Sequence, residues 1–259
     1  MVLVDLRCHG NSTDREGLSP PHDTANAARD LANLVKSLDW AWPDIVIGHS
    51  LGGKVALQYA LSCAQGDYGD SAKLPKQVWV LDCVPGKVEN KSQYQELEKA
   101  LHALLTLPSP IPSQEYEETS FPFVDSNKKD VQIRQVNLNF SPQPKFGLVI
   151  LTQQIDHGVL HTMDSWNEGR NLDSDYWSLL EEPPKGMEIA IVRTESQLTW
   201  NQDVVERLES LASRESDESR GKVSVYVVPH SGHWIYKDNP ERLLEIMTPS
   251  IASLVQLKL

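Results

Sequence analysis

The chain has 259 residues and a net charge of −12, from 36 acidic and 24 basic side chains. That length suits one large domain or a domain with an insertion, and the acidic balance argues against a nucleic-acid partner, because such a surface repels phosphate. The three cysteines (Cys8, Cys63 and Cys83) are odd in number and widely spaced, which suggests neither a disulfide framework nor a zinc site and fits a reducing compartment.

Short apolar runs alternate with helical patterns along most of the chain. The apolar runs predict strands at residues 2–6, 44–48, 77–84, 187–193 and 222–229. Apolar residues at helical spacing predict helices at 27–38, at 51–63, around 204–208, and from Asn239 and Pro240 onward. This alternation is typical of a parallel sheet covered on both faces, so the expected fold class is α/β with a mostly parallel, doubly wound sheet.

The pattern changes between Pro85 and Gly186, where helices without strands are expected. Amphipathic helices are expected around residues 94–105 and within 166–180. We therefore predict a core made of residues 1–86 and 187–259, and a helical lid inserted at 87–186.

Two histidines of the predicted lid, His157 and His161, are four residues apart, as metal ligands on one helical face can be. No glutamate completes an H-E-x-x-H motif and no third ligand accompanies them. We therefore interpret them as polar lid residues and expect no metal.

The segment GHSLGG, residues 48–53, joins the second predicted strand to the following helix. Gly-x-Ser-x-Gly between a strand and a helix is typical of the nucleophile elbow, in which the serine occupies a strained turn and the glycines allow close packing. Ser50 is therefore the candidate nucleophile, and the backbone N–H of Leu51 is the candidate oxyanion donor. The alternative is an ordinary glycine-rich turn.

A serine hydroxyl needs a base that takes its proton, and in this type of site the base follows the final strand. The segment after the last predicted strand contains His230 and His233. Gly232 lets the loop fold tightly before His233, so His233 is the expected base and His230 the alternative.

Four stretches together resemble the α/β-hydrolase fold superfamily: DLRCHGNS (5–12), GHSLGGKVAL (48–57), VLDCVPG (80–86) and GHWIYKDNPERL (232–243). More narrowly they are similar to abhydrolase-domain proteins of the eleven type, found in mitochondria and plastids, and to bacterial acyl esterases with thioesterase activity. The resemblance implies a serine hydrolase that cleaves small-molecule acyl esters or thioesters through an acyl-enzyme, without a metal or cofactor.

The acid of the triad has two candidates. In most of the superfamily it ends a Gly-x-x-Asp turn after the lid, but here that turn reads RTES, with Ser196 in the acid's place and Glu195 one residue earlier. Asp82 ends the strand after the nucleophile's strand and is expected at the same sheet edge. The resembled branch also has its acid in a segment matching LDCVP, so Asp82 is expected and Glu195 is the alternative.

The chain begins directly with a strand, Val2 to Leu6, that is apolar enough for the interior of a sheet. In the resembled families a His-Gly turn, which supplies a second oxyanion N–H, precedes the segment matching DLRCHG by several dozen residues. N-terminal strands and this donor are therefore expected to be missing. The alternative function is a catalytically impaired hydrolase-like protein that binds a ligand or a partner.

Other features set expectations for location and substrate. No apolar stretch approaches the ~20 residues that cross a bilayer, so an intracellular, soluble protein is expected, with mitochondrion or plastid implied by the resemblance if a targeting segment precedes it. The Leu- and Trp-containing lid helices suggest an apolar acyl group. Arg7 and His9, after the first strand, are expected to border the site without a catalytic role.

Overall fold

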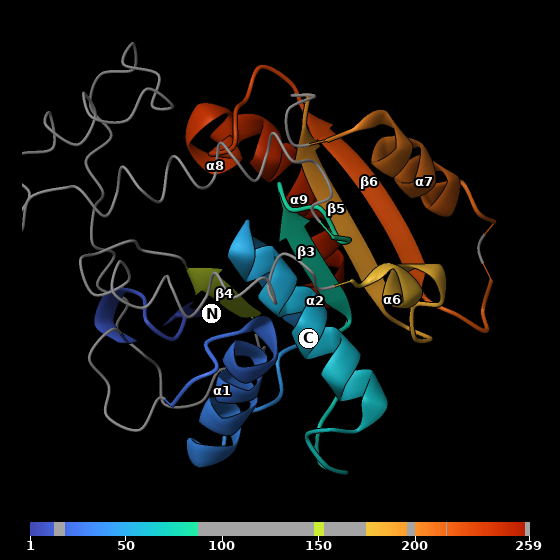
Figure 1. Cartoon of the computed structure of the whole chain (residues 1–259). Helices are drawn as coiled ribbons and strands as arrows, with labels where there is room; N and C mark the ends of the chain where they lie inside the picture. Colours follow the sequence, from blue (N-terminus) through green and yellow to red (C-terminus); the bar gives the residue numbers. More distant parts are fainter. Residues whose placement is uncertain (13–18, 88–147, 153–174, 196–199, 216, 257–259) are drawn as a thin grey trace, which may run out of the picture. The chain divides into compact units, whose positions relative to one another are not determined.

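The structure is a computed structural model that describes residues 1–12, 19–87, 148–152, 175–195, 200–215 and 217–256 (Figure 1). These residues belong to a compact unit formed by Met1–Val88 and Pro144–Leu259. The strands are β1 Val2–Asp5, β2 Ile45–His49, β3 Gln77–Leu81, β4 Leu148–Thr152, β5 Glu188–Thr194 and β6 Lys222–Val228. The helices are α1 Thr24–Ser37, α2 Leu51–Gln65, α6 Trp177–Glu181, α7 Gln202–Ala212, α8 Ile235–Asp238 and α9 Pro240–Gln256, with a 3-10 turn at Gly10–Ser12.

The strands form one parallel sheet in the order β1-β4-β2-β3-β5-β6. Five of them correspond to the five predicted strands within a few residues, so the predicted α/β fold class with a parallel sheet is confirmed. The carboxyl ends of parallel strands meet at one edge of the sheet, which is where ligands bind in open α/β folds.

Strand β4 corrects the sequence prediction. It lies within 87–186, where helices without strands were predicted, and that prediction is wrong at Leu148–Thr152. Val149 of β4 lies opposite Val2 of β1 on one side and opposite Val46 of β2 on the other. The predicted helix around 94–105 lies outside the described residues, and the one within 166–180 is described only from residue 175, where α6 follows. The division into a core and a lid stays a prediction.

Alternate residues of the central strands pack into two cores on opposite faces of the sheet. Val78 and Val80 of β3 join buried residues of α1, α2, α6 and α7 in one core. Trp79 and Leu81 join buried residues of α8 and α9 in the other. Figure 1 shows the same division, with α9 on the side of the sheet opposite to α1 and α2. The helices predicted at 27–38, at 51–63, around 204–208 and from Asn239 and Pro240 onward are confirmed as α1, α2, α7 and α9, while the short α8 was not predicted.

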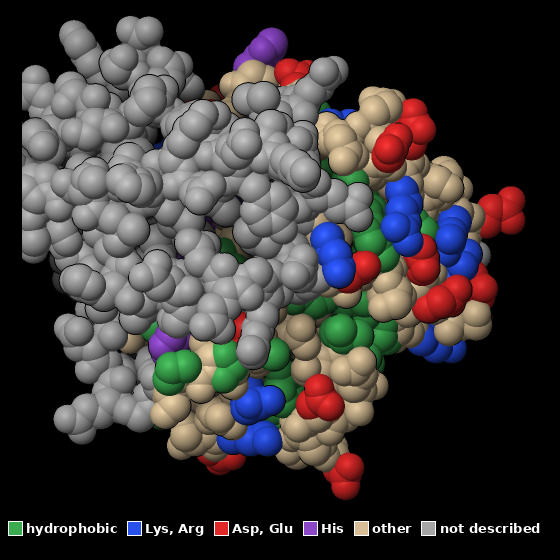
Figure 2. Space-filling model, in the orientation of Figure 1, with side chains coloured by type: hydrophobic (Ala, Val, Ile, Leu, Met, Phe, Trp, Pro, Cys, Tyr) green, Lys and Arg blue, Asp and Glu red, His purple; other side chains and the backbone are tan. Residues whose placement is uncertain are grey.

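Basic and acidic side chains are interspersed on the face of the molecule shown in Figure 2. Over α6 and α7, Arg207 pairs with Glu181 and also lies over the Trp177 ring, with its guanidinium carbon 4.0 Å from the ring centroid. No helix in the described ranges is long and apolar enough to span a bilayer.

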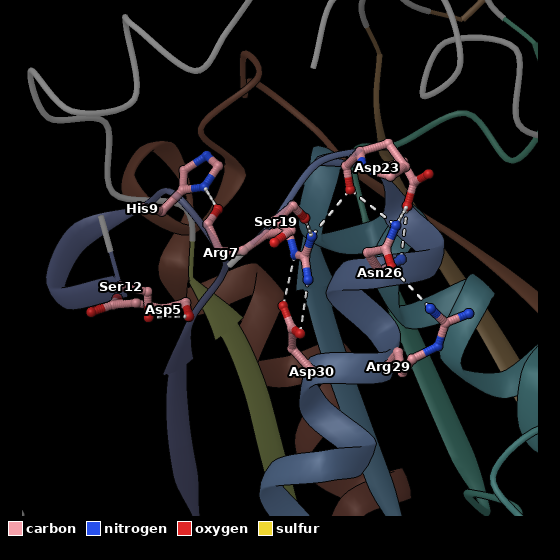
Figure 3. Close-up of polar contacts among 10 residues, drawn as sticks. Asp5, Arg7, His9, Ser12, Ser19, Asp23, Asn26, Arg29 and Asp30 are labelled. Carbon is pink, nitrogen blue, oxygen red and sulfur yellow. Dashed lines mark hydrogen bonds and ion pairs between the residues drawn. The ribbon is translucent and has the colours of Figure 1, made fainter. Parts of the chain in front are cut away.

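Arg7, in the turn after β1, connects that turn to α1 (Figure 3). Its Nε and Nη2 donate to the two carboxylate oxygens of Asp30, at 2.7 and 2.9 Å, and Nη1 donates to the carbonyl of Pro21 at 3.1 Å. His9 Nδ1 donates to the Arg7 carbonyl at 2.8 Å. A buried guanidinium with a bidentate carboxylate partner anchors the backbone of this turn to α1.

Candidate active site

Three candidate residues follow strand ends at the carboxyl edge of the sheet: Ser50 after β2, Asp82 after β3 and His233 in the loop after β6. The backbone is left-handed at Ser50 (φ 53°), at Asp82 (φ 45°) and at His230 (φ 55°) in that loop. A non-glycine residue in this conformation is strained, and such residues concentrate at functional sites. The strain therefore points to this edge as the candidate active site.

The turn at Ser50 depends on close packing between β2 and α2. Ser50 has φ 53° and ψ −121°, and its N–H donates to the Leu81 carbonyl at 2.9 Å. A Cβ at Gly48 would lie 2.0 Å from the carbonyl oxygen of Gly52. Only glycine therefore fits at position 48.

Replacing Gly48 with Ala is expected to lower the free energy of unfolding by about 3 kcal/mol, because the added methyl group meets backbone atoms that cannot rotate away. The matched control is Gly69→Ala, where φ is +81° and no heavy atom lies within 4 Å of the added Cβ. That control is expected to cost only about 1 kcal/mol, from backbone strain alone. Urea unfolding of both variants measures the difference, and equal losses would contradict the packing argument.

Asp82 and His233 lie in direct contact. The Nδ1–H of His233 donates to Oδ2 of Asp82 at 2.7 Å, although 151 residues separate them in the chain. The Asp82 side chain is 1% exposed and the His233 side chain 42% exposed, so a buried carboxylate holds a partly accessible imidazole. With Nδ1 engaged in this bond, Nε2 is the ring nitrogen that can accept a proton from a nucleophile.

The other oxygen of Asp82 accepts two further hydrogen bonds. Trp200 Nε1 donates to Oδ1 at 2.7 Å, and the backbone N–H of Thr194 donates to it at 3.2 Å. These donors compensate for the burial of the carboxylate and fix its plane. Sequence reasoning missed Trp200 because it lies 118 residues from Asp82, and no local pattern marks it as a partner.

Replacing Trp200 with Phe is expected to lower kcat about 10- to 100-fold with little change in KM. Phe keeps most of the ring volume but loses one hydrogen bond to a charged group, which is worth about 1.5–3 kcal/mol. Trp42→Phe, which removes the indole that stacks on Tyr68, is the matched control and is expected to retain wild-type kcat. Steady-state kinetics on both variants provides the test, and equal kcat values would show that the indole donor is not needed.

Glu195 and His230, the two alternatives from the sequence, contact each other instead. The backbone N–H of His230 donates to the Glu195 carboxylate at 3.3 Å. Glu195 is exposed, whereas Asp82 is buried. The structure therefore brings Asp82, and not Glu195, to the imidazole of His233.

The loop that carries His233 is tied down by polar contacts. The N–H of Gly232 donates to the Asp238 carboxylate at 2.8 Å, and the Asn239 side-chain amide donates to the Pro229 carbonyl at 3.0 Å. Ser231 Oγ donates to the Val228 carbonyl at 2.7 Å. These bonds fix the loop on both sides of the histidine.

His49, the last residue of β2, is a titratable group next to this loop. Burial, followed by the proximity of His233, lowers the pKa of His49 to about 4. Asp82 and Lys237 also face it, with opposite and smaller effects on its pKa. His49 is therefore neutral at neutral pH.

The low pKa of His49 makes folding stability depend on pH. In the unfolded chain His49 takes up a proton below pH 6.5, whereas in the folded protein it does so only near pH 4. The unfolded state therefore binds more protons between these values, and stability falls as pH falls through this window. From pH 7 to 4.5 the loss is expected to be on the order of 2 kcal/mol. Urea unfolding at both pH values should show a smaller loss for His49→Gln; an unchanged loss would contradict the assignment.

No group of three or more His, Cys, Asp or Glu in the described part of the chain could hold a metal ion. His157 and His161 lie outside the described residues. A cavity of about 360 Å³ opens near the amino ends of β3, β5 and β6, with Gln77, Glu188 and Lys222 in its lining. None of Ser50, Asp82 and His233 lines it, so this cavity is separate from the candidate site.

Sequence comparisons identify a family and a relative of this chain. A family model described as the alpha/beta hydrolase family matches residues 1–246. A mouse (Mus musculus) protein described as the sn-1-specific diacylglycerol lipase ABHD11 is 23% identical over 254 residues, which cover 97% of this chain and 71% of the mouse protein.

Comparison of structures shows the same fold in solved proteins. MenH from S. aureus is 17% identical with a TM-score of 0.54, and the match covers 98% of this chain and 82% of MenH. A thermophilic esterase from Thermogutta terrifontis, solved with malate bound, is 16% identical with a TM-score of 0.53, and the match covers 96% of this chain and 78% of the esterase. At these identities the likeness concerns the fold alone.

Proposed function

The chain belongs to the alpha/beta hydrolase family, as the sequence predicts, and from this premise we propose that it is a serine hydrolase that cleaves acyl esters or thioesters. The observation that carries the proposal is the 2.7 Å hydrogen bond from His233 to the buried Asp82, at the sheet edge where the strained turn holds Ser50. A base oriented by a carboxylate, together with a serine in such a turn, is the arrangement that activates a hydroxyl.

The proposed reaction has two halves. Ser50 Oγ attacks the acyl carbonyl carbon while His233 Nε2 takes the hydroxyl proton. The tetrahedral intermediate then collapses, the bond to the leaving oxygen or sulfur breaks, and His233 gives its proton to the leaving group. Water, activated by the same imidazole, attacks the acyl-enzyme and releases the acid and free Ser50. Asp82 stays ionised throughout and stabilises the imidazolium, and no step uses a metal or an organic cofactor.

The oxyanion of the intermediate needs donors. Leu51 is the first residue of α2, and the first N–H groups of a helix have no partner within the helix. We assign the N–H of Leu51 as one oxyanion donor, where the helix dipole adds to its effect.

The substrate class rests on the mouse relative as well as on the chemistry. That relative is described as a lipase of diacylglycerol. A lipase breaks carboxylic ester bonds, which is the reaction that an acyl-enzyme on Ser50 would perform. A small-molecule acyl ester or thioester is therefore the proposed substrate.

The test is labelling by a fluorophosphonate probe, which reacts only with an activated serine. The purified chain is expected to be labelled at Ser50, with the adduct located by mass spectrometry of the peptide that contains it. Ser50→Ala is expected to lose the label entirely. Ser37→Ala, at an exposed serine near the end of α1, is the matched control and is expected to label like the wild type.

Untreated wild-type protein should also hydrolyse p-nitrophenyl acyl esters, and treatment with the probe should abolish this hydrolysis because it blocks Ser50. Chain-length preference among these esters measures acyl specificity. Absence of both labelling and hydrolysis in protein that unfolds cooperatively would overturn the proposal. That result would favour the alternative of a hydrolase-like protein that binds without catalysing.

A further inference from the structure

His49 makes a hydrogen bond that the proposed mechanism does not use. It is the last residue of β2 and directly precedes Ser50. Its Nε2 lies 2.7 Å from the backbone carbonyl oxygen of His233, across 184 residues of sequence. A carbonyl oxygen only accepts, so Nε2 carries the proton and donates.

The ring of His49 also packs against the loop of the candidate base. Its centroid lies 4.6 Å from the His233 ring, 5.3 Å from the Trp234 ring and 5.1 Å from the Tyr236 ring. The imidazole is therefore held by aromatic neighbours while it donates to the backbone of His233. Because His49 is neutral, it adds no positive charge beside His233 when that imidazole becomes charged during turnover.

We propose that His49 is a positioning residue, which fixes the backbone of His233 to the end of the strand that carries Ser50. Two consecutive residues of one chain segment then present the nucleophile and hold the base. This inference rests on the proposed function and adds a residue to it.

The role differs from a general structural one because the loop has other anchors. The bonds from Gly232 to Asp238 and from Asn239 to Pro229 hold the loop without His49. Loss of the His49 donor is therefore expected to shift the imidazole while the loop stays folded. A displacement of about 1 Å at a reacting group can reduce the rate on the order of 100-fold.

Three substitutions of His49 distinguish the effect of its hydrogen-bond donor from the effect of its aromatic ring. His49→Phe keeps an aromatic ring and removes the donor. In His49→Gln the side-chain amide nitrogen reaches the place of Nε2, and in His49→Asn it is one methylene too short. We expect kcat to fall about 10- to 100-fold in His49→Phe and His49→Asn, with unchanged KM and thermal midpoint, and to return to within about three-fold of wild type in His49→Gln.

A second measurement does not depend on activity. The Nδ1 proton of His233, shared with Asp82, is observable by NMR as a downfield resonance whose exchange with water reports how firmly the imidazole is held. We expect faster exchange in His49→Phe and His49→Asn, and wild-type exchange in His49→Gln.

The inference is overturned if His49→Phe keeps both wild-type kcat and wild-type exchange, or if His49→Gln is as impaired as His49→Asn. Failure of the proposed function gives a different result, in which the wild-type chain itself takes no fluorophosphonate label. The exchange rates of the His233 proton still decide the role of His49 in that case.

Discussion

Replacing His233 with Gln is expected to reduce kcat by about 10⁵- to 10⁶-fold, because the variant removes the only group proposed to take the proton from Ser50. Gln has no basic nitrogen, so a neutral hydroxyl must attack the acyl group unaided. KM is expected to change little, since the imidazole acts on the transition state more than on the bound substrate. Fluorophosphonate labelling should slow in parallel, because it depends on the same activated serine.

His230 provides the matched control for this experiment. It lies in the same loop, and its backbone N–H contacts Glu195. His230→Asn is expected to keep kcat within about three-fold, because Asn tolerates the left-handed backbone at this position. Loss of activity in His230→Asn, with activity retained in His233→Gln, would show that His230 and not His233 is the base.

Replacing Asp82 with Asn is expected to reduce kcat by about 10⁴-fold. The carboxylate accepts the Nδ1–H of His233, whereas the amide of Asn can present its own N–H₂ group to that nitrogen. The imidazole would then carry its proton on Nε2 and could not accept one from Ser50. A thermal unfolding curve separates this effect from instability, since Asp82 is also buried and hydrogen-bonded to Trp200.

Glu195→Gln is the control for the acid. Its carboxylate is exposed and accepts only the weak hydrogen bond from the His230 backbone among its described contacts, so kcat is expected to stay within about three-fold of wild type. The reverse pattern, an inactive Glu195→Gln and an active Asp82→Asn, would show that the acid is Glu195, in the turn after β5. That result would contradict the assignment of Asp82.

The fold could be predicted where the information is local. Each of the five predicted strands is a continuous apolar run, and such a run reports burial within a sheet by itself. Strand β4 was missed although Leu148–Thr152 is equally apolar, because it lies in a region of the sequence where only helical patterns were recognised. Its partners β1 and β2 lie about 100 residues or more away in the chain, and pairing at that distance leaves no periodic signal.

The residues of the candidate site also divide into those that a local sequence pattern reveals and those that it does not. The turn at Ser50 could be predicted because a strand, a Gly-x-Ser-x-Gly turn and a helix follow one another around GHSLGG. The choice of Asp82 over Glu195 needed the strand order as well as the family resemblance. Trp200 and His49 could not be found from sequence, because each acts through one hydrogen bond that spans more than a hundred residues.

The position of β4 has a consequence for the order in which the protein can assemble. Within the described residues, β1 joins the sheet through β4 alone, with Val2 opposite Val149. During synthesis β1 leaves the ribosome long before β4 has been made. The apolar β1 therefore has no described strand to pair with at that stage. In a nascent chain that ends before Leu148, β2 and β3 can already pair with each other, whereas β1 has no partner strand among those described. The unpaired β1 is then a segment to which chaperones can bind.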